Sequence, residues 1–157
     1  MKDEKIQELI TRIHQEFDEI KIVIKRIKEG WERTRRLSDD YYLDGVALNL
    51  HGFYMGSEQI FANIAESVDG YLPRGESWHL LLLQQMMTEI PSIRPPVITV
   101  ETGTKLDEYR RFRHMIRNVY TFNFDPVKIG KLVADAPSLF EQLKAEVSAF
   151  TDFLEQA

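Results

Sequence analysis

Residues 5–31 read KIQELITRIHQEFDEIKIVIKRIKEGW, in which apolar side chains recur at alternating intervals of four and three. This spacing places side chains on one face of an α-helix over successive turns. The pattern continues for more than three heptads and predicts a long bundle helix, with Gly30 as a candidate bend and 38–40 as its end. The apolar positions are Ile6, Ile10, Ile13, Phe17, Ile20, Ile24, Ile27 and Trp31.

The next segment, 43–64, has the same alternation of three and four and is expected to pair antiparallel with the first helix. A two-chain coiled coil is the alternative to this intramolecular pairing. Small residues form a second stripe on the segment, and each interior glycine costs about 1 kcal/mol relative to alanine. Close approach of another helix is the favoured explanation, and a ligand against bare backbone is the alternative. The stripe consists of Gly45, Asn49, Gly52 and Gly56.

Turn and cap signals divide the rest of the chain into further helices. Asp125-Pro126 reads as an N-cap followed by a first-turn proline, and Pro137 is expected to open the last helix. No β-type alternation is present, so the chain is predicted to be all-α: an up-and-down bundle of four main helices plus short ones, in one domain over 1–157. The predicted segments are a loop at 71–76, a short helix at 77–89, a proline-rich connector at 90–96, the fourth main helix at 102–120, a short helix at 126–133 and a last helix from 137.

The amino-acid composition limits the classes of protein to which the chain can belong. The chain has 157 residues, no cysteine and a formal net charge of −5. No apolar run reaches the roughly 18 residues of a membrane span, and residues 1–5 lack the apolar core of a signal peptide, so a cytoplasmic protein without membrane contact is expected. Basic charge is local, concentrated in 21–36, which argues against a general nucleic-acid coat. No metal or cofactor is expected, because the four histidines stand alone.

The stretch 110–120, RRFRHMIRNVY, has a phosphate-binding composition within an acidic protein. On a helix Arg113, Arg117 and Tyr120 form one stripe with Arg110 beside them, along the edge of the apolar face. Partial burial strengthens the bidentate hold of guanidinium groups on phosphate. Ion pairs on a helix surface are the alternative. His79, at the start of the short helix, is either a structural histidine or a neighbour of Arg113.

Residues 112–122, FRHMIRNVYTF, resemble the last core helix of HEPN-domain proteins, particularly the HepT branch of toxins. Residues 52–65, GFYMGSEQIFANIA, resemble the second helix of that branch. In the family pattern the arginine matches Arg113, the polar residue falls on His114 and the tyrosine matches Tyr120. Asn118 occupies the position of the family histidine, which is a departure from the pattern.

The resemblance implies a bundle that dimerises and places the motif of both chains in a shared basic cleft. Active members cleave RNA without a metal ion and are paired with a minimal nucleotidyltransferase antitoxin, which transfers adenylate to the tyrosine, here Tyr120. Positions 113 and 118 are about 140° apart around a straight helix, so one chain does not turn both toward one phosphate. A two-fold axis brings a second copy opposite the first.

RNA cleavage in such a cleft requires removal of a proton from the ribose 2′-hydroxyl, protonation of the leaving oxygen and stabilisation of charge on phosphorus. Arg113, with Arg117 or Arg110, is suited to the last task. Asn118 forms hydrogen bonds but does not transfer protons near neutral pH, so His114 or His79 has to act as acid or base. The sequence does not decide whether the chain is an enzyme. It is compatible with three functions: a HepT-like ribonuclease toxin, a non-catalytic partner subunit that binds nucleotide or RNA, and a helical dimer with structural arginines.

Overall fold

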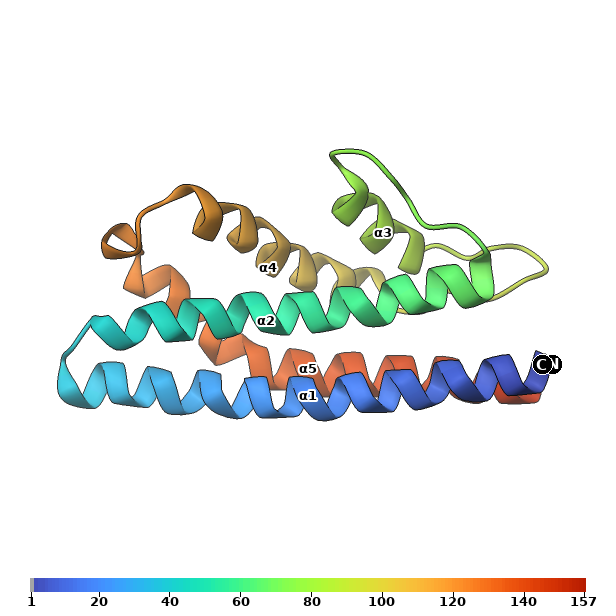
Figure 1. The fold of residues 1–157 in the computed structure, drawn as a ribbon, viewed down its shortest axis with the longest axis horizontal. Coiled ribbons are helices and arrows are strands. Elements are labelled where there is room, and N and C mark those ends of the chain that lie inside the picture. The colour runs from blue at the N-terminus through green and yellow to red at the C-terminus, as the bar shows by residue number, and fades with distance from the viewer. Residues whose placement is uncertain (1) are drawn as a thin grey trace.

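Two long antiparallel helices form one side of the bundle in the computed structural model, which describes residues 2–157 (Figure 1). Helix α1 spans Lys2–Leu37 and helix α2 spans Tyr41–Ile64. The predicted antiparallel pairing is confirmed, and α1 continues through Gly30 without a break in the helix. The predicted domain begins at Met1, which lies outside the described residues.

The small residues of α2 meet α1 at one end of their stripe. A Cβ atom at Gly56 would lie 2.6 Å from Cγ1 of Ile20, closer than side-chain atoms tolerate. At Gly52 the nearest atom, Cγ1 of Val23, is 3.7 Å away, and at Gly45 nothing lies within 4 Å. Helix approach therefore explains Gly56, whereas it explains neither Gly52 nor Gly45.

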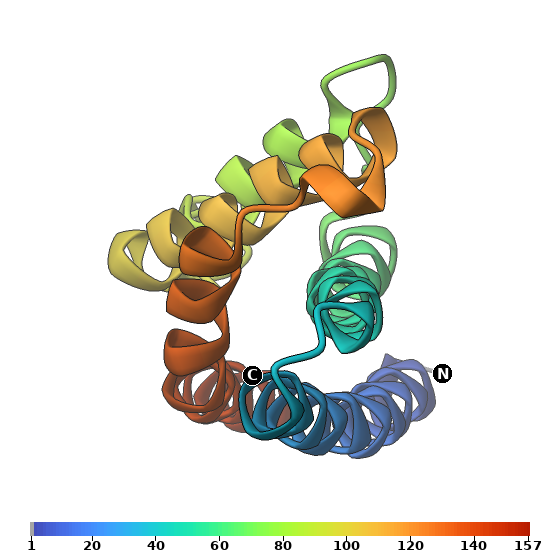
Figure 2. The same cartoon turned by 90° about the vertical axis from the view of Figure 1, so that its left-hand side faces the viewer.

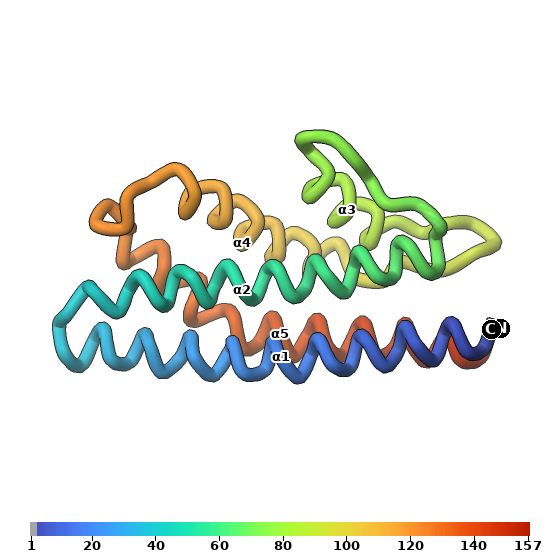
Figure 3. Tube along the Cα trace, in the orientation of Figure 1, coloured from blue at the N-terminus to red at the C-terminus, as the bar shows by residue number. Residues whose placement is uncertain are grey.

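The proline-rich connector lies at the end of the bundle where α1 begins (Figures 1 and 3), and Ile93 lines one pocket together with Ile6 and Ala157. It is fixed by Arg94, which is 3% exposed and donates from Nε and Nη2 to the Asp69 carboxylate at 2.6 and 2.8 Å. Asp69 belongs to the π-helical turn Ala65–Asp69 that continues α2, and this turn ends at Gly70 with φ +70°. Burial of a fully paired Arg–Asp bond holds the connector against the end of α2.

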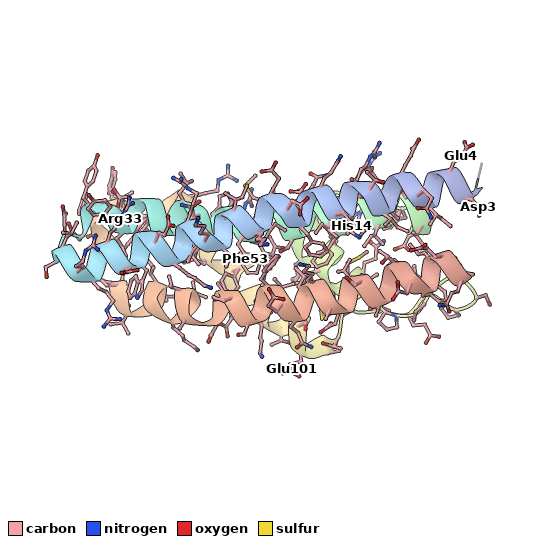
Figure 4. The ribbon with its side chains drawn as sticks, turned by 90° about the horizontal axis from the view of Figure 1, so that it is seen from below. Asp3, Glu4, His14, Arg33, Phe53 and Glu101 are labelled. Carbon is pink, nitrogen blue, oxygen red and sulfur yellow. The ribbon has the colours of Figure 1, made fainter. Side chains whose placement is uncertain are left out.

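Helices α3 (Trp78–Met86) and α4 (Val100–Asn118) cover α2 on the side away from α1 (Figure 2). The core runs through the middle of this arrangement, where the ring of Phe53 from α2 meets Tyr109 of α4 edge to face at 5.2 Å. Phe53 is fully buried, and Figure 4 labels it between α1 and the last helix, α5 (Pro126–Gln156), in the view from below. An all-α bundle is thus confirmed, and within 2–157 no helix is long and apolar enough to cross a membrane.

Helix α5 spans Pro126–Gln156 as one element, so the prediction that Pro137 opens a new helix is wrong. Asp125 caps this helix by accepting a hydrogen bond from the Val127 backbone N–H at 3.0 Å, as its sequence signal indicates. An interior proline removes one backbone hydrogen bond and bends a helix without ending it. The first turns of α5 run at a steep angle to the rest, which lies along α1 (Figure 2).

Helix α4 begins and ends two residues earlier than predicted, at Val100 and Asn118. Val119 and Tyr120 have extended backbone conformations, and a single 3₁₀ turn, Thr121–Asn123, follows. The predicted helical stripe of arginines and tyrosine therefore does not include Tyr120. Because α4 ends before Tyr120, the direction of the Tyr120 side chain is not set by helical spacing.

Candidate functional site

Helix α4 is held at its start by α5 and at its middle by the core. The Thr99 hydroxyl accepts the Thr102 N–H at 3.1 Å, and Glu146 of α5 accepts the Thr99 N–H and the Thr102 hydroxyl, each at 2.6 Å. Near the middle, the Tyr109 hydroxyl donates to the Leu132 carbonyl at 2.7 Å. These contacts fix the rotation of α4 and so decide where its arginines point.

Arg113 follows the buried Phe112 on α4 and lies at the edge of the apolar face, half-buried. Its Nη1 atom is 3.2 Å from Nε2 of His79, the second residue of α3. The other ring nitrogen of His79, Nδ1, is 2.7 Å from Oε2 of Glu58 on α2. Three helices thus meet in one polar chain, Glu58–His79–Arg113, which we call the polar triad.

The chemical nature of the side chains indicates which atoms of the polar triad donate hydrogen bonds. Arginine only donates, so the Arg113 contact requires a lone pair on Nε2 of His79. The proton of a neutral ring then lies on Nδ1, which donates to the Glu58 carboxylate. Glu58 is 8% exposed, and its acceptance of this bond compensates for its burial. This pattern of hydrogen bonds directs the Nε2 lone pair of His79 at Arg113.

Tyr54 extends the polar triad into the core. It is buried, and its hydroxyl interacts electrostatically with the same Glu58 carboxylate. Burial raises the pKa of the Tyr54 hydroxyl far above its ordinary value, and the neighbouring negative charge of Glu58 raises this pKa further. Tyr54 therefore stays protonated beside Glu58.

The His79 ring is also held by Trp78, whose ring centroid lies 3.8 Å away at an interplanar angle of 32°. Only 18% of the His79 side chain is exposed. A ring held by a neighbouring indole, a carboxylate and a guanidinium has one defined orientation. The polar triad thus combines a positioned imidazole with a partly buried cation.

The arginines of α4 divide into paired and unpaired groups. Nε of Arg110 lies 2.6 Å from Asp107 Oδ1, and Nε of Arg111 lies 3.3 Å from Oδ2 of the same carboxylate. Among the described residues no carboxylate forms an ion pair with Arg113 or with Arg117, which is exposed. The ion-pair interpretation fits Arg110 and Arg111, whereas Arg113 and Arg117 keep their charge available for an anion.

His51 lies on the same face of α2 as Tyr54 and Glu58, three and seven positions earlier. Burial lowers the pKa of His51, and the positive charges of Arg113 and Arg117 lower this pKa further against an opposing effect of Glu58. Its Nδ1 is buried without a hydrogen-bond partner within the described chain. Protonation would place an unpaired N–H in that position, so His51 is suited to remain neutral and not to act as a base.

The other residues singled out in the sequence lie outside the polar triad, most of them near the C-terminal end of α4. His114 and Asn118 are exposed, and Asn118 Nδ2 donates to the His114 carbonyl of its own helix at 2.7 Å. Tyr120 is 75% exposed beyond the end of α4. His14 is exposed on α1 (Figure 4), which lies on the opposite side of the bundle from α3 and α4 (Figure 2). Of the histidines expected near Arg113, the structure brings His79 into contact with it.

Sequence reasoning missed Glu58, Tyr54 and His51. A signal was present, because Glu58 interrupts the apolar face of α2 next to Ser57, and a carboxylate on a buried face needs a partner. Among residues 2–157, no group of three or more histidine, aspartate or glutamate side chains is arranged to hold a metal ion.

The protein is thus an all-α bundle in which a partly buried arginine, an imidazole and a carboxylate meet at the junction of three helices. A family model described as HepT-like protein matches residues 45–154, from α2 to the last turns of α5. The match covers most of the chain, and the protein therefore belongs to the HepT-like family. Comparison with curated proteins and with solved structures gave no match.

Proposed function

We propose that this HepT-like protein is the toxin component of a toxin–antitoxin pair and cleaves RNA without a metal ion. The observation that carries the proposal is the position of His79, held between the Glu58 carboxylate and the Arg113 guanidinium. A neutral imidazole with an oriented lone pair is a general base, and a partly buried guanidinium is a phosphate ligand. The site thus offers both functions to one phosphodiester.

The proposed reaction begins when Arg113 turns its donors to the phosphate and releases Nε2 of His79. Nε2 then takes the proton of the ribose 2′-hydroxyl, the 2′-oxygen forms a bond to phosphorus, and the bond from phosphorus to the 5′-oxygen breaks. The leaving 5′-oxygen takes up a proton, for which His114 and water are available donors. Arg113 and Arg117 stabilise the charge that develops on the phosphate oxygens.

We further propose that the chain acts in the cytoplasm as a homodimer in which the arginines of two copies line one cleft. Its partner in this proposal is a minimal nucleotidyltransferase antitoxin that transfers adenylate to Tyr120. The exposure of the Tyr120 side chain supports access to its hydroxyl. Added phosphate would bring negative charge toward Arg117, which lies three residues earlier and has no acidic partner among the described residues, and would oppose RNA binding.

The second candidate function is a non-catalytic subunit that binds nucleotide or RNA for a nucleotidyltransferase. Asn118 favours it, because this side chain replaces the family histidine and its amide is engaged with the backbone of its own helix. This candidate uses Arg113 and Arg117 as phosphate ligands and leaves His79 as a structural group.

Growth of cells that express the protein from an inducible promoter tests the proposed function. We expect the wild type to arrest growth, Arg113→Ala to restore it, and co-expression of a nucleotidyltransferase encoded beside the gene to restore it as well. Arg111→Ala is the matched control, because Arg111 is an exposed arginine of the same helix that pairs with Asp107. Normal growth with abundant wild-type protein would contradict the toxin role and favour the non-catalytic subunit.

A further inference from the structure

Two aromatic side chains stand out from the surface just after α4. Tyr120 is 75% exposed and Phe122 is 77% exposed, and their rings stack on one another with centroids 5.5 Å apart and planes 7° from parallel. We call these two residues the aromatic pair. Most large apolar side chains of the protein are buried, so two rings that stack on each other in solvent form a distinct surface feature.

Residues on both sides anchor the aromatic pair. Val119 is half-buried against the core, and Phe124 is 7% exposed within it. The 3₁₀ turn between them is closed by the N–H of Asn123, which donates to the Tyr120 carbonyl at 2.9 Å, and by that of Phe124, which donates to Thr121 at 3.1 Å. The backbone is therefore fixed at both ends while the two rings point outward.

The surroundings of the aromatic pair are polar and carry positive charge. Thr121 and Asn123 are exposed on the same turn, and the exposed Arg117 lies three residues before Tyr120. Asp125, the nearest acidic residue that follows, is engaged in capping α5. A protein interface of standard type would present a wider apolar patch than two rings and the nearby exposed Val127. Flat aromatic faces beside arginines are instead typical of sites for unpaired nucleobases.

We infer that the aromatic pair is a stacking site for an unpaired base of single-stranded RNA whose phosphates lie on Arg117 and Arg113. This inference rests on the proposed nucleic-acid substrate and specifies it, because bases inside a duplex are stacked on their neighbours and do not offer a free face. The arginines hold the backbone and the aromatic pair holds the adjoining base. Base–aromatic stacking contributes about 1–3 kcal/mol per base, which corresponds to about 5- to 150-fold in affinity.

Fluorescence anisotropy with a labelled, 2′-O-methylated oligonucleotide tests this site, because the methyl groups prevent cleavage. We expect the wild type to bind the single strand and to bind the same sequence as a duplex at least about tenfold more weakly. Phe122→Ala and Tyr120→Ala should each weaken single-strand binding about tenfold, whereas Phe122→Tyr and Tyr120→Phe should bind like the wild type. The alanine variants leave the buried anchors Val119 and Phe124 in place, and circular dichroism verifies their helix content.

The outcomes separate this inference from the proposed function. Loss of binding in Arg113→Ala with full binding in Phe122→Ala would overturn the stacking site and leave the Arg113 site intact. The reverse result would support the stacking site and remove the phosphate role of Arg113. Equal binding of duplex and single strand would overturn the inference. Conversion of a dimer to a monomer by Phe122→Ala in light scattering would also overturn it, because the aromatic pair would then be an interface between copies.

Discussion

His79 acquires its chemical character from two neighbours that are distant in sequence. Glu58 fixes the proton on Nδ1, and Arg113 faces the lone pair on Nε2. Neither neighbour alone defines a base, since a carboxylate next to histidine is common in structural ion pairs. In the proposed function, the Arg113 cation on the opposite nitrogen couples the imidazole to phosphate binding. In the proposed reaction, Arg113 leaves Nε2 of His79 when it binds the phosphate, and the imidazole is then free to act as a base.

Ring-nitrogen NMR spectra test this tautomer. In ¹⁵N-labelled wild-type protein near pH 8, we expect His79 to show a protonated Nδ1 and a bare Nε2. Inorganic phosphate should shift the Nε2 resonance in the wild type and leave it unchanged in Arg113→Ala, with the exposed His14 as an internal control. A protonated Nε2 in the phosphate-free protein would contradict the assignment.

His51 gives the protein a dependence of stability on pH. Burial and the charges of Arg113 and Arg117 lower the pKa of His51 in the folded state, with Glu58 opposing them. Between this lowered pKa and the unfolded value of about 6.5, the unfolded chain binds more protons than the folded chain. The contribution of His51 to stability is therefore complete above about pH 6.5 and is lost as the pH falls below that value. Urea unfolding at pH 7 and pH 5 should show a smaller loss in His51→Gln than in the wild type, and equal losses would show that His51 is not responsible.

At the scale of single elements, periodic apolar spacing predicted α1, α2 and their pairing, because it reflects burial along one helix face. It did not predict the continuity of α5 through Pro137, since packing along both halves stabilises a bent helix that local propensity disfavours. The same spacing predicted that α4 continues to Tyr120. In the structure the helix ends at Asn118, and Val119 and Tyr120 have an extended backbone conformation. These differences lie at helix ends and at a proline, where local signals compete with packing.

The junction of α4 with α5 sets the position of the arginines, and Glu146 is its central group. Hydrogen bonds from Thr102, Thr99 and Gln142 lower the pKa of Glu146 despite the opposing effect of burial. The stability it contributes is present above about pH 4.5 and is lost as the pH falls through its lowered folded value. Glu146→Ala should lower the free energy of unfolding at pH 7 by about 1 kcal/mol, measured by denaturant titration. Glu141→Ala, an exposed change on the same helix, is the control, and equal stability of the two variants would contradict this role of Glu146.

At the scale of the whole molecule, the polar triad exists because the bundle brings α2, α3 and α4 together (Figure 1). The composition of 110–120 indicated a phosphate site, and the start of α3 suggested that His79 could lie near Arg113. Glu58 was not predicted, since it lies 21 residues before His79 and only the packing of α3 on α2 makes the two neighbours. Individual helices can be predicted from the spacing of their own apolar residues, whereas a site shared by three helices depends on how these helices pack.

We expect the protein to assemble as a homodimer. A homodimer places two copies of the Arg113 region in one cleft, and we expect multi-angle light scattering at tens of micromolar protein to give twice the mass of the 18.4 kDa chain. The same mass should be found for Arg113→Ala, whose side chain is only half-buried and lies outside the core. A strict monomer at this concentration would contradict the shared cleft.

We propose that Arg113 and His79 cleave RNA through its 2′-hydroxyl, and incubation of an end-labelled single-stranded RNA with the protein in EDTA measures this reaction. The wild type should produce fragments ending in 2′,3′-cyclic phosphate and spare the same strand with 2′-deoxyribose throughout. Arg113→Ala and His79→Gln should each cleave at least about 10²-fold more slowly, with His14→Gln unchanged. Intact RNA after incubation with folded wild-type protein, or full cleavage by His79→Gln, would contradict the claim.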